Sequence, residues 1–156
     1  MQIKILIIIP AYNEEESIKG VILDLQKSNK AYDIIIINDG SIDKTSEIAR
    51  KEKNVIVIDL PSNVGIGGAV QTGFIYAYRH NYDIAVQFDG DGQHAANEIS
   101  KIIAPIKAKK ADCVIGSRFL NNKKGFQSTL IRRIGIKIFE YVNSILIKQK
   151  ITDNTS

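Results

Sequence analysis

The sequence predicts an α/β fold built around a mostly parallel sheet, and two observations support this prediction. Short runs rich in Ile and Val recur along the chain, without the polar alternation of a strand that has one wet face. Segments with the apolar spacing of helices separate these runs. Such alternation, with right-handed crossovers, places helices on both faces of the sheet, so we expect a three-layer α/β/α sandwich.

We expect five strands that are buried on both faces. They cover residues 3–9, 33–38, 55–60, 84–88 and 113–115. The single cysteine, Cys113, lies in the last run and is expected to pack as a small buried residue. One cysteine also excludes an internal disulfide and favours a reducing compartment.

Five segments are expected to be helical. They cover residues 14–28, 44–51, 67–79, 97–109 and 129–148. Asn13, with Glu16 three residues later, predicts a capped start for the first of them. Pro105 is expected to kink or shorten the fourth, because proline removes a backbone hydrogen bond.

Composition limits the class of protein. With 156 residues, 44% of them hydrophobic and 24% charged, the chain has the size and balance of one soluble domain, which we expect over residues 1–156. The net charge of +4 is mild, so it favours an anionic ligand or a membrane surface and gives no support for nucleic acid. There is no secretory signal, and no apolar run reaches the roughly 18–20 residues of a membrane span. We therefore expect a cytoplasmic protein.

Polar clusters follow four of the five predicted strands, at the point where each strand ends. They occupy residues 10–15, 38–41, 89–91 and 116–119. The carboxyl ends of parallel strands meet at one edge of the sheet, where α/β folds bind their ligands. We therefore expect these clusters to form one site.

The most informative cluster is VQFDGDGQH, residues 86–94. It places Asp89 and Asp91 one residue apart, with Gln93 two residues further on. Two carboxylates this close repel each other unless a cation or hydrogen bonds offset the repulsion. Mg²⁺ and Mn²⁺ prefer oxygen ligands, typically carboxylates together with substrate phosphates. The stretch indicates a metal–diphosphate site, and the alternative is an acidic turn, in which Asp and Gly are common.

The first two clusters predict contacts to a flat ligand. Pro10 and Ala11 let the backbone approach such a ligand, and Glu14 suits the positive end of a helix. Asp39 follows a buried strand directly, so its carboxylate can accept hydrogen bonds from a base or a ribose hydroxyl. Three further residues of this loop, Ser41, Asp43 and Thr45, are expected to be structural.

Glycines and arginines complete the set of candidates. The stretch at residues 62–74 contains Gly68 but lacks the spacing and position of a dinucleotide fingerprint, so its glycines indicate close backbone approach at a helix start. Arg118 presents a planar guanidinium that pairs well with phosphate. Residues 129–148 are amphipathic and basic, which fits either a helix packed on the core or an interfacial helix whose Arg132 and Arg133 contact phosphate.

Five motifs, in this order and at these spacings, resemble the family 2 inverting glycosyltransferases. The motifs are IPAYNEEESI, INDGSIDKT, N-x-G-x-G-G-A, FDGDGQH and GSRF. The resemblance is greatest to the dolichyl- and polyprenyl-phosphate mannosyl- and glucosyltransferase branch. It implies a GT-A fold, a UDP- or GDP-sugar donor, and Mg²⁺ or Mn²⁺ as the cofactor.

The resemblance also implies roles for individual residues. Asp89, Asp91 and Gln93 would hold the metal, and Asp91 and Arg118 would be catalytic. The nucleotide-sugar would contact Pro10, Ala11, Tyr12, Glu14, Asp39, Gly68, Asp89, Gly90 and Asp91. The acceptor phosphate would contact Arg118, Arg132 and Arg133.

The expected chemistry is inversion at the anomeric carbon, with the acceptor attacking opposite the departing diphosphate. No unambiguous general base stands in the chain, which favours an acceptor that is already anionic, a polyprenyl or dolichyl phosphate. With a hydroxyl acceptor, Asp91 or Asp153 would be the candidate base. The sequence ends at Ser156 within a motif that the family usually continues, so we expect a chain truncated at its C-terminus whose full-length form works at the cytoplasmic face of a membrane.

Three alternatives stay open at this point. The first is a glycosyltransferase that acts on a saccharide hydroxyl in cell-envelope polysaccharide synthesis. The second is a sugar-1-phosphate nucleotidyltransferase, which would be expected to carry a glycine-rich basic loop where this chain has PAYNEE. The third is a nucleotide-binding module without catalytic activity.

Overall fold

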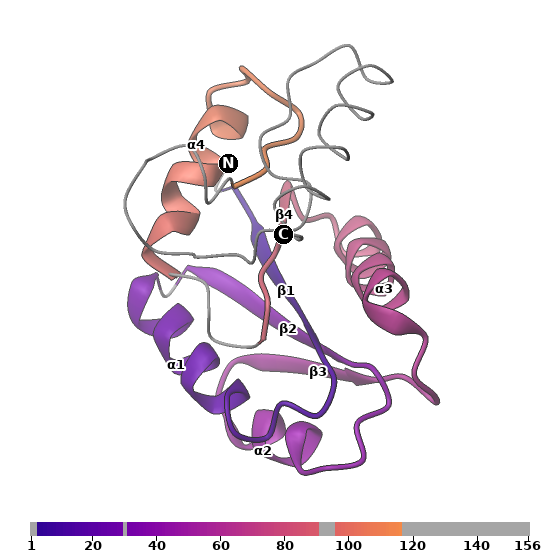
Figure 1. Cartoon of the computed structure of the whole chain (residues 1–156). Helices are drawn as coiled ribbons and strands as arrows, with labels where there is room; N and C mark the ends of the chain where they lie inside the picture. Colours follow the sequence, from indigo (N-terminus) through magenta and orange to yellow (C-terminus); the bar gives the residue numbers. More distant parts are fainter. Residues whose placement is uncertain (1–2, 30, 91–95, 117–156) are drawn as a thin grey trace, which may run out of the picture. The chain divides into compact units, whose positions relative to one another are not determined.

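A computed structural model describes residues 3–29, 31–90 and 96–116 of the chain (Figure 1). The elements, in order, are β1 (Ile5–Ala11), α1 (Ile18–Ser28), β2 (Tyr32–Asn38), α2 (Thr45–Lys51), β3 (Val55–Asp59), α3 (Gly65–Arg79), β4 (Ile84–Gln87), the 3₁₀ turn η1 (Ala96–Glu98) and α4 (Ile99–Lys107). The chain divides into two compact units, Met1–Ile103 and Ala104–Ser156, and the first contains the four strands found among the described residues. That residues 1–156 act as one domain stays a prediction.

The four strands form one sheet in the order β3-β2-β1-β4, and every pairing is parallel. Ile8 in β1 pairs with Ile35 of β2 on one side and with Gln87 of β4 on the other. All of β1 is buried, and so is β2 apart from one exposed residue, Asp33. Burial on both faces is the reason that these strands read as unbroken apolar runs. The predicted α/β class and parallel sheet are confirmed.

Helices cover both faces of the sheet, with α1 and α2 on one face and α3 on the other (Figure 1). Side chains alternate between the faces along each strand, so Leu6 and Ile8 point toward α3, where they pack with Ala69 and Ala77. Gly73 of α3 lies directly over β1, because an added Cβ would collide with the Ile8 side chain. The small residues on this stripe of α3 therefore bring the helix close to the sheet.

The start of α1 differs from the prediction. The helix begins at Ile18 rather than at residue 14, and Asn13 does not cap it. Asn13 has a positive φ of 55°, and its Oδ1 accepts a hydrogen bond from the backbone N–H of Ile42, 3.0 Å away. The reason is a tertiary one, since side chains from another loop bind the backbone of residues 13–15 and hold them in a turn.

The predicted fifth strand is wrong. Residues 113–115 are irregular, and Cys113 is exposed rather than buried. A run of three apolar residues becomes a strand only where it pairs with a sheet edge, and in the described part of the chain β4 pairs with β1 alone. Pro105 does lie inside α4, which ends at Lys107, two residues before the predicted end.

Other predicted features lie outside the described residues, among them the helical segment at 129–148. Within the residues that are described, no helix has both the length and the apolarity needed to cross a membrane.

Candidate functional site

The loops at the carboxyl ends of the four strands surround a pocket of about 320 Å³. It is lined by Pro10, Ala11, Tyr12, Glu14, Asp39, Asn63, Gly65, Ile66, Ala69, Asp89 and Gly90. In the sheet, β1 has β2 on one side and β4 on the other, so the direction of the chain connections reverses beside β1. Ligands of open α/β sheets bind at such a reversal, outside the carboxyl ends of the strands.

The structure brings together most of the residues expected to contact the nucleotide-sugar. The lining includes Pro10, Ala11, Tyr12, Glu14, Asp39, Asp89 and Gly90. Gly68 is different, because it is not among the lining residues and an added Cβ would lie 2.6 Å from the Val64 side chain. Its place in the structure therefore points to local packing at the start of α3.

Several predicted site residues lie outside the described part of the chain. They are Asp91, Gln93, Arg118, Arg132 and Arg133. Their roles at the metal, in catalysis and at the acceptor phosphate stay predictions.

Pro10 and Gly90 allow two segments of backbone to approach each other at the pocket. Pro10 lies just beyond Ile8–Gln87, the last pair of the β1–β4 ladder, where a missing N–H interrupts no ladder hydrogen bond. A Cβ added to Gly90 would lie 3.3 Å from the Pro10 carbonyl oxygen. A larger residue at position 90 would therefore push the loop after β4 away from β1.

Asp39 is the most buried acid of the pocket, at 3% exposure. Its backbone N–H donates to the Ala11 carbonyl at 2.8 Å, and its Oδ1 accepts from the Val64 N–H at 2.7 Å. Within the described part of the chain, Oδ2 of Asp39 has no hydrogen-bond donor. A buried carboxylate oxygen is stable only with a donor, so a ligand that brings an N–H or O–H group to Asp39 fits this site.

Gly40 sets the path of the loop between β3 and α3. Its φ is +70°, and an added Cβ would lie 2.7 Å from the backbone nitrogen of Asn63. The loop passes this close to β2, so Asn63, Gly65 and Ile66 reach the pocket.

Sequence reasoning missed these three residues and Ala69. The predicted polar clusters follow the other strands, and within residues 62–74 only Gly68 was expected at the nucleotide-sugar. The signal was available, because residues 60–63 follow the end of β3 at the same edge of the sheet.

The described acids of the pocket fit a hard divalent cation in their chemistry. Glu14, Asp39 and Asp89 offer only oxygen donors, and no Lys or Arg is among the described lining residues. A diphosphate would meet net negative charge there unless a cation accompanied it. The described residues include no group of three His, Cys, Asp or Glu able to hold a metal ion. Asp89 is the one member of the predicted metal set that the structure describes, because Asp91 and Gln93 lie outside the described residues.

A second polar cluster lies at the end of β3, outside the pocket lining. Asp59 accepts hydrogen bonds from Ser46 (2.6 Å), Arg50 (2.6 Å) and Asn38 (2.8 Å). The hydrogen bonds from Ser46 and Arg50 are the main reason that the pKa of Asp59 is lowered to about 2. This cluster joins α2, β2 and β3 to one another.

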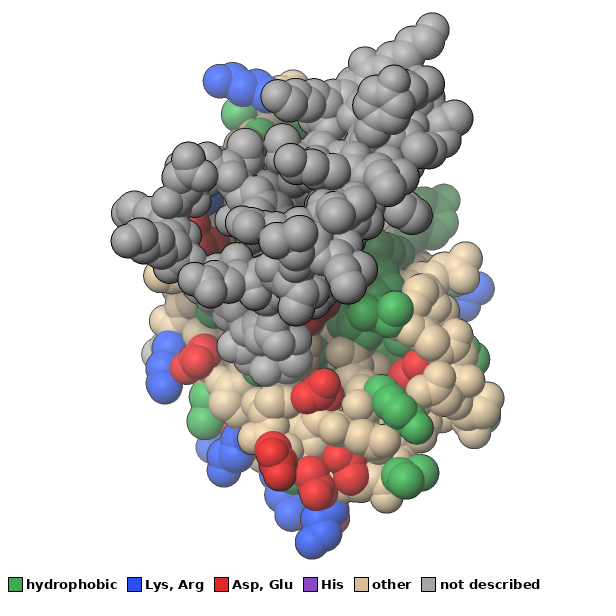
Figure 2. Space-filling model, in the orientation of Figure 1, with side chains coloured by type: hydrophobic (Ala, Val, Ile, Leu, Met, Phe, Trp, Pro, Cys, Tyr) green, Lys and Arg blue, Asp and Glu red, His purple; other side chains and the backbone are tan. Residues whose placement is uncertain are grey.

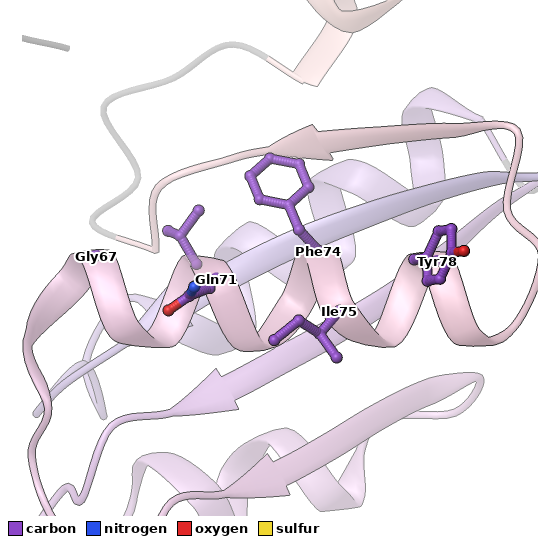
Figure 3. Close-up of a pocket in the computed structure, with 6 residues that line it drawn as sticks. Gly67, Gln71, Phe74, Ile75 and Tyr78 are labelled. Carbon is purple, nitrogen blue, oxygen red and sulfur yellow. The ribbon is translucent and has the colours of Figure 1, made fainter.

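Acidic side chains gather at the edge where β1 and β2 end, as Figure 2 shows in the orientation of Figure 1. A larger hollow of about 550 Å³ lies along α3 and is lined by Gly67, Val70, Gln71, Phe74, Ile75 and Tyr78 (Figure 3). Its described lining carries no Asp, Glu, Lys, Arg or His. Of these two hollows, the pocket at the strand ends is the one whose described lining carries acidic side chains.

Comparison with known proteins agrees with this geometry. Residues 6–156 match the family described as glycosyl transferase family 2. A UDP-N-acetylglucosamine–dolichyl-phosphate N-acetylglucosaminyltransferase of Methanococcus voltae is 40% identical over 169 residues, covering 97% of this chain and 66% of the relative. A polyprenol monophosphomannose synthase of Mycolicibacterium smegmatis is 33% identical over 120 residues, covering 74% of this chain and 45% of the relative.

A solved structure supports the fold. Glucosyl-3-phosphoglycerate synthase of Mycobacterium tuberculosis, in complex with Mn²⁺, UDP and glucosyl-3-phosphoglycerate, superposes with a TM-score of 0.54 at 24% identity. The match covers 66% of this chain and 39% of that one. The chain thus spans between 45% and 66% of the length of the two relatives named above. The resemblance inferred from the five motifs is confirmed, and the chain belongs to glycosyl transferase family 2.

Proposed function

We propose that this chain forms the donor-binding part of an enzyme that transfers a sugar from a UDP- or GDP-sugar to a polyprenyl or dolichyl phosphate. The observation that carries the proposal is Asp39, a buried acid in a pocket at the strand ends whose Oδ2 has no donor within the described residues. A nucleoside supplies such a donor through a base N–H or a ribose hydroxyl. Membership of the family and the activities for which the two relatives are named support the sugar-transfer chemistry.

Each part of the pocket has a task in this proposal. Pro10, Ala11 and Tyr12 form a wall for the flat base, and Asp39 accepts its hydrogen bond. Asp89, with Asp91 and Gln93 of the predicted metal set, would hold Mg²⁺ or Mn²⁺ beside the diphosphate. The ion, when bound, supplies positive charge that offsets the charge of the leaving diphosphate. The remaining protein groups orient the donor and exclude water from its anomeric carbon.

The lipid-phosphate acceptor rests on chemistry and on relatives. An anionic phosphate oxygen attacks without prior loss of a proton, so it requires little help from a general base. Both named relatives are described as acting with dolichyl phosphate or polyprenol. Under this proposal Arg118, Arg132 and Arg133 would attract the acceptor phosphate, and the full-length enzyme would work at the cytoplasmic face of a membrane.

A saccharide hydroxyl is the alternative acceptor, and it would require a carboxylate base. The two acceptors are separated by a transfer assay with the full-length protein, which offers a short polyprenyl phosphate in one arm and a soluble oligosaccharide in the other. Transfer to the oligosaccharide alone would contradict the lipid-phosphate acceptor and leave the donor site in place.

The donor site itself is tested by isothermal titration of UDP and GDP, each with Mn²⁺ and with EDTA. We expect one of the two nucleotides to bind, and binding to weaken in EDTA and in Asp91→Ala by on the order of a few kcal/mol, because a charged ligand of the ion is lost. Equal affinity with Mn²⁺ and with EDTA would contradict the metal site. Binding of neither nucleotide would contradict the proposed function.

A further inference from the structure

The loop after β1 and the loop after β2 are joined by five hydrogen bonds, each from a backbone N–H to a side-chain oxygen. In the first direction, the Asn13 N–H donates to Ser41 Oγ (2.9 Å), the Glu14 N–H to Thr45 Oγ1 (2.7 Å) and the Glu15 N–H to Asp43 Oδ2 (3.1 Å). In the opposite direction, the Ile42 N–H donates to Asn13 Oδ1 (3.0 Å) and the Lys44 N–H to Glu15 Oε2 (3.1 Å). We call Asn13, Glu15, Ser41, Asp43 and Thr45 the inter-loop network.

Thr45 is the buried member of the inter-loop network, with no exposed surface. Its hydroxyl donates to Asp43 Oδ1, and this direction leaves an oxygen lone pair to accept the Glu14 N–H. Burial alone raises the pKa of Asp43, but the hydrogen bonds from Thr45 and Glu15 outweigh that effect and leave the pKa below its ordinary value. Asp43 is therefore held as a carboxylate, which can only accept hydrogen bonds and so keeps the Thr45 hydroxyl in its orientation.

The inter-loop network ends at a wall of the pocket. Glu14 lines the pocket, and its N–H is the group bound by Thr45. On the other side its carbonyl accepts the Ile18 N–H at 2.9 Å, and its carboxylate accepts the Ser17 hydroxyl. Both the N–H and the carbonyl of Glu14 are therefore hydrogen-bonded. The bond to Ile18 is local in sequence, whereas the bond to the Thr45 hydroxyl is the tertiary contact.

The sheet does not hold this wall by itself. The β1–β2 ladder ends at the pair Ala11–Asn38, followed by the hydrogen bond from the Asp39 N–H to the Ala11 carbonyl. Beyond that point the pocket residues Tyr12 and Glu14 have no sheet partner. The first hydrogen bond of the inter-loop network is made by Asn13, the residue that follows Tyr12.

We propose that Thr45, oriented by Asp43, is a positioning residue that sets the place of the Tyr12–Glu14 wall and thereby the affinity of the pocket for a nucleoside diphosphate. This inference rests on the proposed function, since it assigns a task at the same pocket. It goes further because neither Thr45 nor Asp43 lines the pocket, and both belong to the residues expected to be structural.

The chain offers a matched control in the next residue of α2. The Ser46 hydroxyl donates to Asp59 at 2.6 Å in the cluster that joins α2 to β3, and neither Ser46 nor Asp59 lines the pocket. Loss of either hydroxyl removes two hydrogen bonds, because Thr45 Oγ1 accepts from the Glu14 N–H and donates to Asp43, while Ser46 Oγ donates to Asp59 and accepts from Arg50 Nε. Only the loss of Thr45 Oγ1 leaves a backbone N–H of the pocket wall without its acceptor.

The test compares Thr45→Val, Thr45→Ser and Ser46→Ala in the full chain, with UDP and GDP in Mn²⁺ as probes. Calorimetry measures the dissociation constant, and thermal unfolding measures Tm. We expect Thr45→Val to weaken binding about tenfold, because the Glu14 N–H loses its acceptor, and Thr45→Ser to restore affinity to within about twofold of wild type. Ser46→Ala should lower Tm and leave the dissociation constant unchanged.

Four outcomes decide the matter. Wild-type affinity in a folded Thr45→Val variant would overturn the inference and leave the proposed function intact. Equal weakening in Ser46→Ala would also overturn it, because the effect would then follow stability alone. If Thr45→Val does not fold, Asp43→Asn replaces it, with weakened binding expected and unchanged binding against the inference. Absence of nucleotide binding in the wild type would overturn the proposed function and this inference together.

Discussion

The interior of the sheet and its carboxyl edge are built from opposite kinds of residue. In β1 and β2 the side chains are almost all apolar and buried, and the backbone is satisfied by the ladder. Within the described residues the buried polar side chains are Asn38, Asp39 and Thr45, and all three lie at or just beyond the end of β2. There the side chains satisfy the backbone of neighbouring loops. The difference teaches that the apolar interior and the polar residues of the proposed site are separate sets of residues.

If the interior carries stability, a cavity there has the largest effect. Ile8 is fully buried and faces α3, so Ile8→Ala should lower the free energy of unfolding by about 2–5 kcal/mol. Ile42 is 91% exposed, and Ile42→Ala should change it by less than about 0.5 kcal/mol. Urea unfolding measures both. Equal losses in the two variants would break the division between interior and surface.

A change at Gly40 should affect both the stability of the fold and the binding of the nucleotide. Gly40→Ala places a Cβ at positive φ and 2.7 Å from the Asn63 nitrogen, so we expect a loss of about 1–3 kcal/mol together with weaker nucleotide binding. The control is Gly20→Ala in α1, where nothing lies within 4 Å of the added Cβ. That change should stabilise by about 0.5–1 kcal/mol. A Gly40→Ala variant as stable as wild type would contradict this, because the loop after β3 would then shift to make room for the added Cβ without a measurable cost in stability.

Asp39 separates binding from stability within a single side chain. Asp39→Asn keeps an oxygen that accepts the Val64 N–H, so Tm should change little while nucleotide affinity falls about tenfold. Asp39→Ala removes that acceptor as well and should cost a further 1–3 kcal/mol, roughly, in unfolding free energy. Calorimetry and thermal unfolding measure the two effects. Unstable Asp39→Asn with intact binding would assign this carboxylate to the turn alone.

The smallest effect is expected from the Asp59 cluster. The pKa of Asp59 is about 2 in the folded chain against an ordinary 3.8, so its carboxylate stabilises the fold above about pH 4. This stabilisation is lost as pH falls from there toward 2, as the group is protonated. The side chain is 43% exposed, and solvent screening limits the effect to about 1 kcal/mol or less. Asp59→Asn should reduce the acid-induced loss of stability between these pH values, and an unchanged acid limb would contradict the role of this cluster.

Much of the architecture followed from pattern alone. Unbroken Ile-rich runs such as β1 and β2 predicted a sheet buried on both faces, because no half-exposed strand is apolar at every position. Parallel strands present their carboxyl ends at one edge of the sheet, and this rule predicted that Pro10, Asp39 and Asp89 lie close together although they are far apart in sequence. All three line one pocket in the structure. Both predictions, the buried sheet and the shared edge, depend on the spacing of apolar residues and on the alternation of strands and helices, which can be read from the sequence.

The predictions that were wrong or incomplete concern residues whose structure depends on contacts with residues distant in sequence. Asn13 has the chemistry of a helix cap, but Ile42 and Ser41 bind it, so α1 begins at Ile18. Residues 113–115 have the apolar character of a strand, but the structure shows them as irregular. Thr45 reads as a turn residue, and only the fold places its hydroxyl against the backbone N–H of Glu14, a residue of another loop that lines the pocket. A local pattern states what a segment prefers, whereas the hydrogen bonds it finally makes depend on which loops the sheet brings within 3 Å or so of each other.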